Sequence, residues 1–397
     1  MRSNKKPNIK ILYTIGYPLG QGGHINSTYA LIKEILKIKP NIKVYLLAPR
    51  GEKANYFKDL GIELISIKNY QNNFIFNLIM TFNLIVCSIK FRINTIHAMD
   101  YKSLKVVVIG NLILWNKLIF TKAGGKPLPT KLPMLSGLIV FSNELKTFYQ
   151  NNFNLHQQEK INLIKERLDI SELKIKQIDS FSNCFSIFIA MRLDNSKKTL
   201  LDNFFNEIKA VKLKNKIIKV IIAGDGPLMS FCSETAKIIS NEFNQNIKFE
   251  FLGEINDKSQ ILQYYNRSNL VVGHGRGIME AMAIGKPVVL LGFDTKGSQL
   301  ISSFNIDNIS NYNFSGRNFI FNDDDKSLVE ILNSEFEAKY LIESGNFNKS
   351  YILNEYNITI GATKTLNVYD NARKHNQKYF INNTKWLINK KLILRSE

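Results

Sequence analysis

Short apolar runs alternate along the chain with longer stretches in which apolar residues recur every three or four positions. The runs predict strands, and the periodic stretches predict helices. In the first half the expected strands are IKILYTIGY (9–17), KVYLLAP (43–49), TIHAMD (95–100), KLIFTKAG (117–124) and GLIVFS (137–142), and INSTYALIKEILKI (25–38) is the expected first helix. Strands that alternate with helices predict a parallel sheet covered by helices on both faces.

A second series of the same kind begins near residue 185. Its expected strands are FSIFIAMRL (185–193), IKVIIAGDG (218–226), IKFEFLGEI (247–255), NLVVGHG (269–275) and KPVVLLG (286–292), with helices starting near Lys198, Pro227, Asp257 and Gly277. The polar segment 168–182 suits a linker between the two series. We therefore predict an α/β protein with two Rossmann-like, doubly wound domains that face a cleft. Ligands of such sheets bind beyond the carboxyl ends of the strands.

The predicted domain bounds are 1–172 for an N-terminal Rossmann-like domain, 180–365 for a C-terminal one, and 366–397 for a basic helical segment. Residues 371–397 mix seven Lys and Arg residues with aromatic residues and leucines and contain one acid, Glu397. This mixture suits a helix at an anionic membrane surface. A closing helix packed on the protein explains it equally well.

Composition narrows the class of protein. The 397 residues are 45% hydrophobic, which indicates a globular chain, and carry a formal net charge of +20. A basic surface attracts polyanions, anionic lipid or phosphorylated substrates. Nucleic-acid binding would rest on charge alone, since no known binding motif is present. The three cysteines lack metal-ligand or disulfide spacing, and no signal peptide is visible, so we expect a cytoplasmic protein.

The segment 74–91, FIFNLIMTFNLIVCSIKF, approaches the length that crosses a membrane. Asn77, Thr81, Asn83 and Ser88 interrupt its apolar character. It is therefore expected to form a buried or partly membrane-facing helix and not a spanning one.

The stretch NLVVGHGRGIMEAMAIGKPVVLLG (269–292) carries the clearest chemistry. Glycines at 273, 275 and 277 allow a tight turn with accessible N–H groups, and a helix that starts near Gly277 adds the positive end of its dipole. Glu280 lies in the first turn, so its carboxylate can reach back toward a ligand. The loop suits a phosphate, and Glu280 suits a sugar hydroxyl. A plain tight turn with a capping glutamate is the simpler alternative, and a dinucleotide fingerprint with Asp294 as its ribose ligand is another.

Arg192 and Lys197 stand five residues apart where a strand ends and the next helix begins. Two cations in such a place can clamp a diphosphate. Together with AGDGP (223–227), FLGEI (251–255), YYNRSNLVV (264–272) and EAMAIGKPVV (280–289), in this order, the stretch 186–292 resembles the nucleotide-sugar-binding domain of GT-B glycosyltransferases of family 4, the glycosyl transferases of group 1.

The resemblance implies roles for individual residues. Arg192 and Lys197 would bind the donor diphosphate and stabilise the leaving nucleoside diphosphate, and Glu280 would hold the ribose. The loop formed by Gly273, His274, Gly275, Arg276 and Gly277 would lie against the donor sugar and phosphates, with Glu254 near the base.

The first half resembles the family more weakly. GQGGHINSTYALIKEI (20–35) is similar to its N-terminal glycine loop and helix, which implies that Gly22 and Gly23 lie near the donor phosphates or the acceptor. TIHAMD (95–100) is similar to a strand end of the family, which implies that His97 lies at the cleft and touches the sugar or the acceptor.

The sequence departs from the family at one position. A glutamate usually stands eight residues before the one that corresponds to Glu280, whereas this chain has Val272 there and His274 and Arg276 in the loop. Recognition of the sugar therefore differs from the common pattern, or catalysis is impaired.

The resemblance implies a retaining hexosyltransferase (EC 2.4) that moves a sugar from a nucleoside-diphosphate-sugar to an acceptor hydroxyl, with no cofactor and no metal. The basic surface favours a saccharide or lipid-linked saccharide acceptor in polysaccharide biosynthesis, peripheral at the inner face of the cell membrane. Alternatives are an NAD(P)-dependent oxidoreductase and a nucleotide-sugar epimerase or hydrolase on the same fold. NDDDKS (322–327) is expected to cap a helix and not to bind metal.

Overall fold

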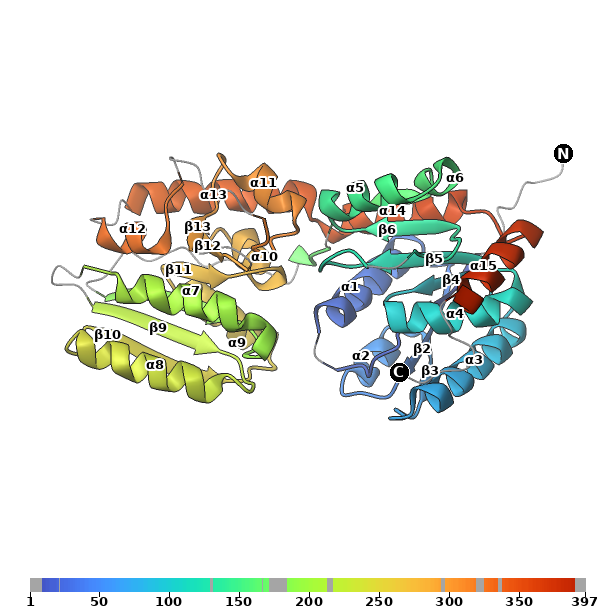
Figure 1. Ribbon diagram of the computed structural model, residues 1–397, viewed down its shortest axis with the longest axis horizontal. Coiled ribbons are helices and arrows are strands. Elements are labelled where there is room, and N and C mark those ends of the chain that lie inside the picture. The colour runs from blue at the N-terminus through green and yellow to red at the C-terminus, as the bar shows by residue number, and fades with distance from the viewer. Residues whose placement is uncertain are drawn as a thin grey trace. The chain divides into compact units, whose positions relative to one another are not determined.

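The computed structural model describes residues 9–20, 22–128, 131–165, 167–170, 184–212, 217–293, 297–318, 325–334 and 338–389. These residues form two compact units (Figure 1). The first contains residues 1–168 and 358–397, and the second contains residues 169–357. Each unit is a mostly parallel sheet with helices on both faces, as predicted.

The first unit has a seven-stranded sheet in the order β3-β2-β1-β4-β5-β6-β7. All its paired strands are parallel. The strands are β1 (Lys10–Thr14), β2 (Lys43–Pro49), β3 (Glu63–Ile67), β4 (Thr95–Ala98), β5 (Lys117–Lys122), β6 (Gly137–Val140) and β7 (Ile161–Leu163). The helices are α1 (Gly23–Ile38), α2 (Ala54–Asp59), α3 (Asn73–Lys90), α4 (Tyr101–Leu114), α5 (Asn143–Asn152), α6 (Leu155–Gln158), α14 (Ile358–Asn371) and α15 (Gln377–Asn389).

The alternation of side chains along β1 explains the two cores of this unit. Ile11 and Tyr13 face a core shared with α1 and α14, whereas Leu12 faces a core shared with α3, α4 and α15. Successive side chains of a strand point to opposite faces, so a strand that is buried on both faces reads as a continuous apolar run. This is why β1 has four consecutive buried residues.

The C-terminal part of the chain returns to the first unit. Helix α14 packs against α1 and places Leu366 and Tyr369 in the first core, and α15 buries Trp386 and Leu387 in the second. The predicted domain bounds differ from this arrangement, because they gave residues 358–365 to the second domain and made 366–397 a separate segment. The described part of the basic segment is a packed closing helix, the alternative to an interfacial one.

The second unit has a six-stranded sheet in the order β10-β9-β8-β11-β12-β13. Its strands are β8 (Cys184–Ala190), β9 (Ile217–Ala223), β10 (Ile247–Gly253), β11 (Leu270–Gly273), β12 (Val288–Leu291) and the antiparallel edge strand β13 (Ser298–Leu300). Its helices are α7 (Lys198–Lys209), α8 (Met229–Glu242), α9 (Lys258–Arg267), α10 (Arg276–Ala283), α11 (Ile306–Asn311), α12 (Leu328–Asn333) and α13 (Ala338–Glu355).

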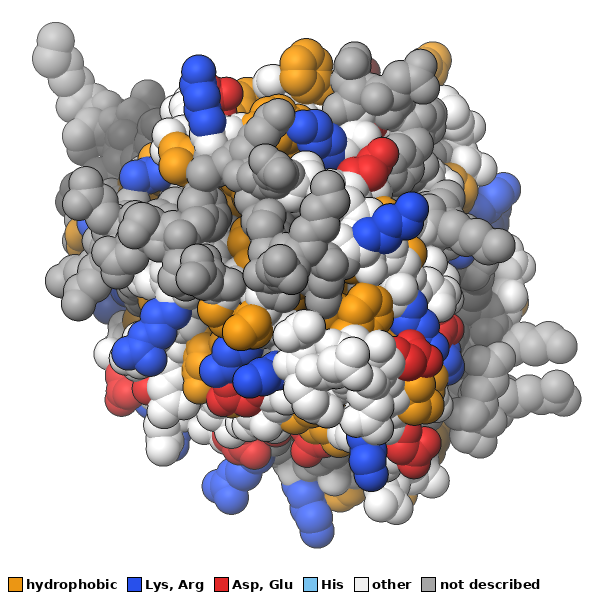
Figure 2. Space-filling model, turned by 90° about the vertical axis from the view of Figure 1, so that its left-hand side faces the viewer, with side chains coloured by type: hydrophobic (Ala, Val, Ile, Leu, Met, Phe, Trp, Pro, Cys, Tyr) orange, Lys and Arg blue, Asp and Glu red, His pale blue; other side chains and the backbone are white. Residues whose placement is uncertain are grey.

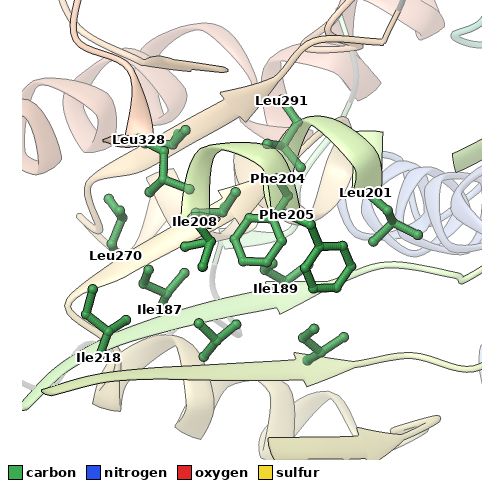
Figure 3. Close-up of a cluster of buried hydrophobic side chains, with 14 of the residues drawn as sticks. Ile187, Ile189, Leu201, Phe204, Phe205, Ile208, Ile218, Leu270, Leu291 and Leu328 are labelled. Atoms are coloured by element: carbon green, nitrogen blue, oxygen red, sulfur yellow. The ribbon is translucent and has the colours of Figure 1, made fainter. Parts of the chain in front are cut away.

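Helix α7 illustrates how this sheet is covered. Its side chains Phe204, Phe205 and Ile208 point onto the sheet and meet Ile187 and Ile189 of β8 (Figure 3). All of these side chains are buried. Burying a side chain of this size contributes about 1.5–3 kcal/mol, so this helix fixes the carboxyl end of β8, where the candidate site begins.

Strand order reverses direction at one place in each sheet. In the first unit the reversal lies between β1 and β4, and in the second between β8 and β11. The loops that leave two such neighbouring strands diverge to opposite faces, which leaves a crevice at the carboxyl end of the sheet. The crevice of the second unit is where the predicted donor residues meet.

Candidate functional site

Two segments meet at the β8/β11 reversal of the second unit. Residues 191–197 follow β8 and end in a 3₁₀ turn (Asn195–Lys197), and residues 273–277 run from the end of β11 into the first turn of α10. β8 and β11 are hydrogen-bonded neighbours. The two cations and the glycine loop, separated by about eighty residues in sequence, therefore lie at one sheet edge as predicted.

The turn after β9 holds the first of these segments in place. Met191 N donates to Ala223 O (3.0 Å) and Leu193 N donates to Asp225 O (2.9 Å). Gly224 lies so close to Met191 that a Cβ at this position would be 1.8 Å from the Met191 carbonyl oxygen. The glycines of AGDGP therefore allow close backbone packing, and the turn after β9 holds the backbone on both sides of Arg192 in place.

Arg192 and Lys197 differ in their surroundings. The Arg192 side chain is 77% exposed, with its Nε 3.8 Å from Asp194 Oδ2. Lys197 is half-buried, with its Nζ 5.5 Å from the centre of the Phe293 ring. Burial lowers the pKa of Lys197, an effect that Asp194 opposes and Arg192 reinforces. A partly desolvated ammonium beside a guanidinium favours an anion between them.

His274 lies within the electrostatic reach of this group. Burial, reinforced by the charges of Lys197 and Arg192 and opposed by that of Asp194, lowers its pKa to about 3. Its ring is therefore neutral at physiological pH. Its Nδ1 is buried and has no hydrogen-bond partner among the described residues. An orphaned buried nitrogen of this kind points to a polar group of a ligand.

The loop reaches α10 through a conformation that favours glycine. Gly275 has φ +64° and precedes the first helical residue, Arg276. Its N–H donates to Phe314 O at 2.6 Å, so this amide is occupied and is not available to an anion. The N-terminal end of α10 nevertheless points its dipole toward the same sheet edge.

Glu280 is held by its own helix. Arg276 Nε donates to Glu280 Oε1 at 3.0 Å, and both side chains are mostly buried. No hydrogen bond to Oε2 is found among the described residues. One carboxylate oxygen is thus fixed by an arginine, and the other remains for a hydroxyl group.

Tyr265 of α9 supports α10 from below. It is buried, and its hydroxyl donates to Gly277 O at 2.9 Å. Burial and the nearby Glu280 carboxylate raise its pKa. This tyrosine ties the first turn of α10 to the sheet, which keeps Arg276 and Glu280 at their positions.

We expect Tyr265→Phe to lower the free energy of unfolding by about 1 kcal/mol, because it leaves the Gly277 carbonyl without its donor and keeps the ring. Urea unfolding followed by circular dichroism measures this. Tyr264→Phe is the matched control, since the neighbouring ring stacks on Phe188 at 5.4 Å and no hydrogen bond of its hydroxyl is found among the described residues. Equal losses in the two variants would contradict the supporting role.

Glu254 follows the end of β10 and is exposed. It stands at the same carboxyl edge of the sheet, two strands away from β8. Glu254 therefore lies apart from the group around His274, and its predicted place near the base of the nucleotide stays a prediction. Asp294, the ribose ligand of the dinucleotide alternative, lies outside the described residues.

The structure corrects the prediction for His97. This residue of β4 is fully buried, and its ring nitrogens lie 2.7 Å from the Tyr369 hydroxyl and 2.7 Å from Thr121 Oγ1. Tyr369 also hydrogen-bonds Tyr13. His97 therefore links the sheet of the first unit to α14, and both nitrogens are occupied by the protein. A position near the end of a strand suggested a ligand contact, but the side chain points into the core.

Gly22 and Gly23 stand at the N-terminal end of α1. Gly22 is the residue before the helix, and its carbonyl accepts from the N–H groups of Ile25 and Asn26 at 3.1 Å. They follow β1 at the reversal of the first unit, so they lie where a doubly wound sheet binds ligands. Their contact with a donor or an acceptor stays a prediction.

The described residues contain no group of three or more His, Cys, Asp or Glu side chains placed to hold a metal ion. Residues 322–324 of NDDDKS lie outside the described part. In the rest, Ser327 caps α12 in a capping box with Glu330, and Asp325 accepts from Asn305 Nδ2 at 2.7 Å. A serine, not an aspartate, is thus the capping residue.

Two residues of the site were not predicted. Asp194 lies between the two cations and caps the 3₁₀ turn through Ser196 N, and Tyr265 supports α10. The position of Asp194 inside RLDNSKK was a signal for the first, because Asp is a frequent N-cap. Nothing local to YYNRS distinguishes Tyr265 from Tyr264, since the contact with Gly277 arises only in the folded chain.

Comparisons with known proteins agree with this geometry. Residues 185–303 match the family described as "Glycosyl transferases group 1". No curated protein sequence matches the chain.

Solved structures share the fold over both units. A glycosyltransferase from Rickettsia africae is 16% identical, with 91% of this chain and 98% of that chain covered and a TM-score of 0.66. Anabaena HepE, solved with UDP and glucose, is 16% identical, with 91% and 99% covered and a TM-score of 0.64. A putative UDP-N-acetylglucosamine 2-epimerase from Listeria monocytogenes is 13% identical, with 90% and 95% covered and a TM-score of 0.55. The resemblance inferred from the sequence is thereby confirmed: the chain has the fold of the GT-B glycosyltransferases, and its residues 185–303 match the glycosyl transferases of group 1.

Proposed function

We propose that the protein is a retaining glycosyltransferase of the hexosyltransferase type, which moves a sugar from a nucleoside-diphosphate-sugar to an acceptor hydroxyl. The observation that carries the proposal is the group at the β8/β11 reversal. There Arg192 and Lys197 lie close enough to a neutral His274 to lower its pKa. The helix that bears Glu280 begins beside them. This group lies within the segment that matches the glycosyl transferases of group 1.

Each residue of the group has a distinct task in this proposal. Lys197 and Arg192 bind the diphosphate and stabilise the charge that develops on it as the bond to the sugar breaks. The N-terminal end of α10 adds its dipole. The free Oε2 of Glu280 accepts hydrogen bonds from the ribose hydroxyls, while Arg276 fixes the orientation of the carboxylate. Cations and a helix dipole can do this work without a metal, so we propose a reaction that needs none.

His274 is the residue of the donor loop that we propose contacts the sugar. Because its ring is neutral, Nδ1 can exchange a hydrogen bond with a sugar hydroxyl next to the diphosphate. We propose that this contact substitutes for the glutamate that the family commonly places where this chain has Val272. Val272 itself is buried within β11 and cannot reach the sugar.

For the acceptor we propose a saccharide or a lipid-linked saccharide, used at the inner face of the cell membrane during polysaccharide biosynthesis. The net charge of +20 supports an anionic membrane surface as the location at which the protein acts. Nucleic acid is not proposed as a partner. On the end of the second unit shown in Figure 2, the basic side chains of the described residues are interspersed with acidic ones.

The test is the thermal shift of the purified protein with UDP-, GDP-, ADP- and dTDP-sugars and with NAD(P). We expect stabilisation by one nucleotide sugar, and UDP-sugars come first because HepE binds UDP. Stabilisation by NAD(P) alone would contradict the proposal and favour the oxidoreductase. Conversion of the bound nucleotide sugar without any transfer to an acceptor would favour the epimerase or hydrolase on the same fold.

Glu280→Gln should raise the Kd of the stabilising nucleotide sugar about 10- to 100-fold, because hydrogen bonds to a charged group contribute about 1.5–3 kcal/mol. Isothermal titration calorimetry measures the change. Glu250→Gln is the matched control, since Glu250 is also paired with a cation, Lys219, at 2.7 Å, but on the surface of β10. An unchanged Kd in Glu280→Gln would remove Glu280 from the donor site.

A further inference from the structure

Helix α3 of the first unit presents an apolar face to solvent over its whole length. Six large apolar side chains of this helix are exposed, and the most exposed, Phe82 and Ile89, each have 66% of their surface accessible. The six are Phe74, Ile75, Leu78, Phe82, Val86 and Ile89. Isolated exposed apolar residues are ordinary, but six on one helix require an explanation.

These six residues share one side of the helix. At 100° per residue they fall within an arc of about 120°, and no polar residue lies between them. The opposite side carries the buried residues Phe76, Met80, Leu84 and Cys87. The first three belong to the core shared with α4. The helix is therefore apolar on both sides, with one side packed in the protein and the other exposed to solvent. We call the six exposed residues the outer face of α3.

The helix is long and apolar enough to cross a membrane by length and composition, with a mean hydropathy of 1.5. Its connections oppose a crossing. It joins β3 to β4, which belong to the same parallel sheet, and it packs alongside α4 (Figure 1). A crossover helix of a folded sheet cannot leave that sheet to span a bilayer, but its free side can lie in the bilayer surface. This agrees with the expectation of a partly membrane-facing helix.

The charges of the segment that carries the outer face are of one sign, and the acid next to it in sequence, Glu63 of β3, lies within electrostatic reach of Cys87 on the buried side of the helix. Between Glu63 and Asp100 the chain contains no acidic residue, and its charged residues are Lys68, Lys90 and Arg92. Lys68 precedes the helix, while Lys90 and Arg92 stand at its end, so both ends of the apolar face carry cations. Lysine and arginine at the margins of an apolar face suit a layer of anionic headgroups.

Aromatic side chains stand at the same end as Lys90. Gly110 of α4 lies against Leu84, and Lys102 Nζ lies 4.1 Å above the Phe76 ring, so α3 and α4 run parallel and end together. At the end of α4, Trp115 is exposed and stacks on Phe380 with 6.3 Å between ring centres. Tryptophan is enriched at the membrane–water interface.

From these observations we infer that the outer face of α3 docks the protein onto an anionic lipid bilayer, with the helix axis in the membrane plane. Apolar side chains would enter the boundary between headgroups and acyl chains, and Lys68, Lys90 and Arg92 would contact the anionic headgroups. The absence of acids from residues 64–99 favours this occupant over a second copy of the chain, which would bring the same cations together. The inference names the surface for the proposed membrane location. The proposed function supplies only the reason why the protein would bind a membrane, and the docking itself does not depend on it.

The test is flotation of the full-length protein with vesicles, without any nucleotide sugar. We expect the protein to float with vesicles of phosphatidylcholine and phosphatidylglycerol (3:1), to stay below with pure phosphatidylcholine, and to bind less in 0.5 M NaCl. Phe82→Gln/Ile89→Gln should lower the partition coefficient at least tenfold. The matched control is Phe304→Gln/Ile238→Gln, which replaces a phenylalanine of 68% and an isoleucine of 52% exposure in the second unit.

Three outcomes would overturn the inference. They are no flotation of the wild type with the anionic vesicles, an equal loss in the two double variants, and a dimer on size-exclusion chromatography that the α3 variant alone dissociates. The last result would assign the face to a second copy. Nucleotide-sugar binding by the α3 variant should equal that of the wild type, so this inference and the proposed function fail separately.

Discussion

Lys197→Met is expected to lower kcat about 10²- to 10³-fold, a cost of about 2.7–4 kcal/mol in the transition state. The ammonium is half-buried near Phe293 and beside Arg192, so it meets the leaving diphosphate in partly desolvated surroundings. Methionine keeps the unbranched stem and removes only the charge. The rate of nucleoside diphosphate release from the donor sugar, with acceptor present, measures the effect.

The adjacent lysine provides the control. Lys198 Nζ lies 2.5 Å from Asp202 Oδ1 of α7 and above the Phe231 ring of α8. Its ammonium group is thus already paired with residues of these two helices. Lys198→Met should therefore leave kcat within about twofold, while both variants keep the cooperative unfolding of the wild type. A Lys197→Met enzyme as active as Lys198→Met would show that the diphosphate is neutralised elsewhere, and Arg192 would be tested next.

The free energy of unfolding is expected to fall steeply as the pH drops below about 6.5. Burial lowers the pKa of His274 and of His375 to about 3, and it lowers the pKa of His97 well below its usual value. The unfolded chain binds protons on these rings at a pH where the folded chain does not. Each histidine then removes about 1.4 kcal/mol per pH unit, so the three together remove about 4 kcal/mol per unit. Their contribution is complete above pH 6.5.

Urea unfolding at pH 7.5, 6.5, 5.5 and 4.5 measures this dependence. Buried carboxyl groups act in the opposite direction, because burial raises the pKa of Asp100 and of Glu207. The difference between wild type and His274→Gln isolates one ring. At pH 4.5 the wild type should have lost about 2.5 kcal/mol more than the variant, relative to pH 7.5. Parallel curves would mean that His274 is charged in the folded protein.

The donor side of the molecule was largely predictable from the sequence. The strand β11, the glycine turn and the start of α10 are contiguous, so local rules place His274, Arg276 and Glu280. Arg192 and Lys197 required one further step, the rule that parallel strands end at the same edge of a sheet. The predicted strand KVYLLAP coincides with β2, and the helix expected to start near Asp257 is α9, which Asp257 caps.

Other features depend on contacts that no local pattern encodes. Strand β3 (ELISI) was not predicted, because it is an edge strand and only Ile67 is buried. His97 stands next to a strand end, yet its partners Thr121 and Tyr369 are 24 and 272 residues away. The return of α14 to the first unit likewise depends on distant surfaces. Its apolar spacing shows that it packs, but not against which sheet.

That return has a consequence for synthesis on the ribosome. The sheet of the first unit is complete in sequence once β7 has been made, yet both of its cores still lack side chains: Leu366 and Tyr369 of α14 in one, and Trp386 and Leu387 of α15 in the other. At 5–20 residues per second, the chain needs about 10 to 45 seconds to extend from Leu168 to the end of α15. During this time the nascent first unit displays an uncovered apolar surface and a His97 without its tyrosine. The second unit is contiguous in sequence, so we expect it to finish folding before the first unit, although the first unit begins earlier in the chain.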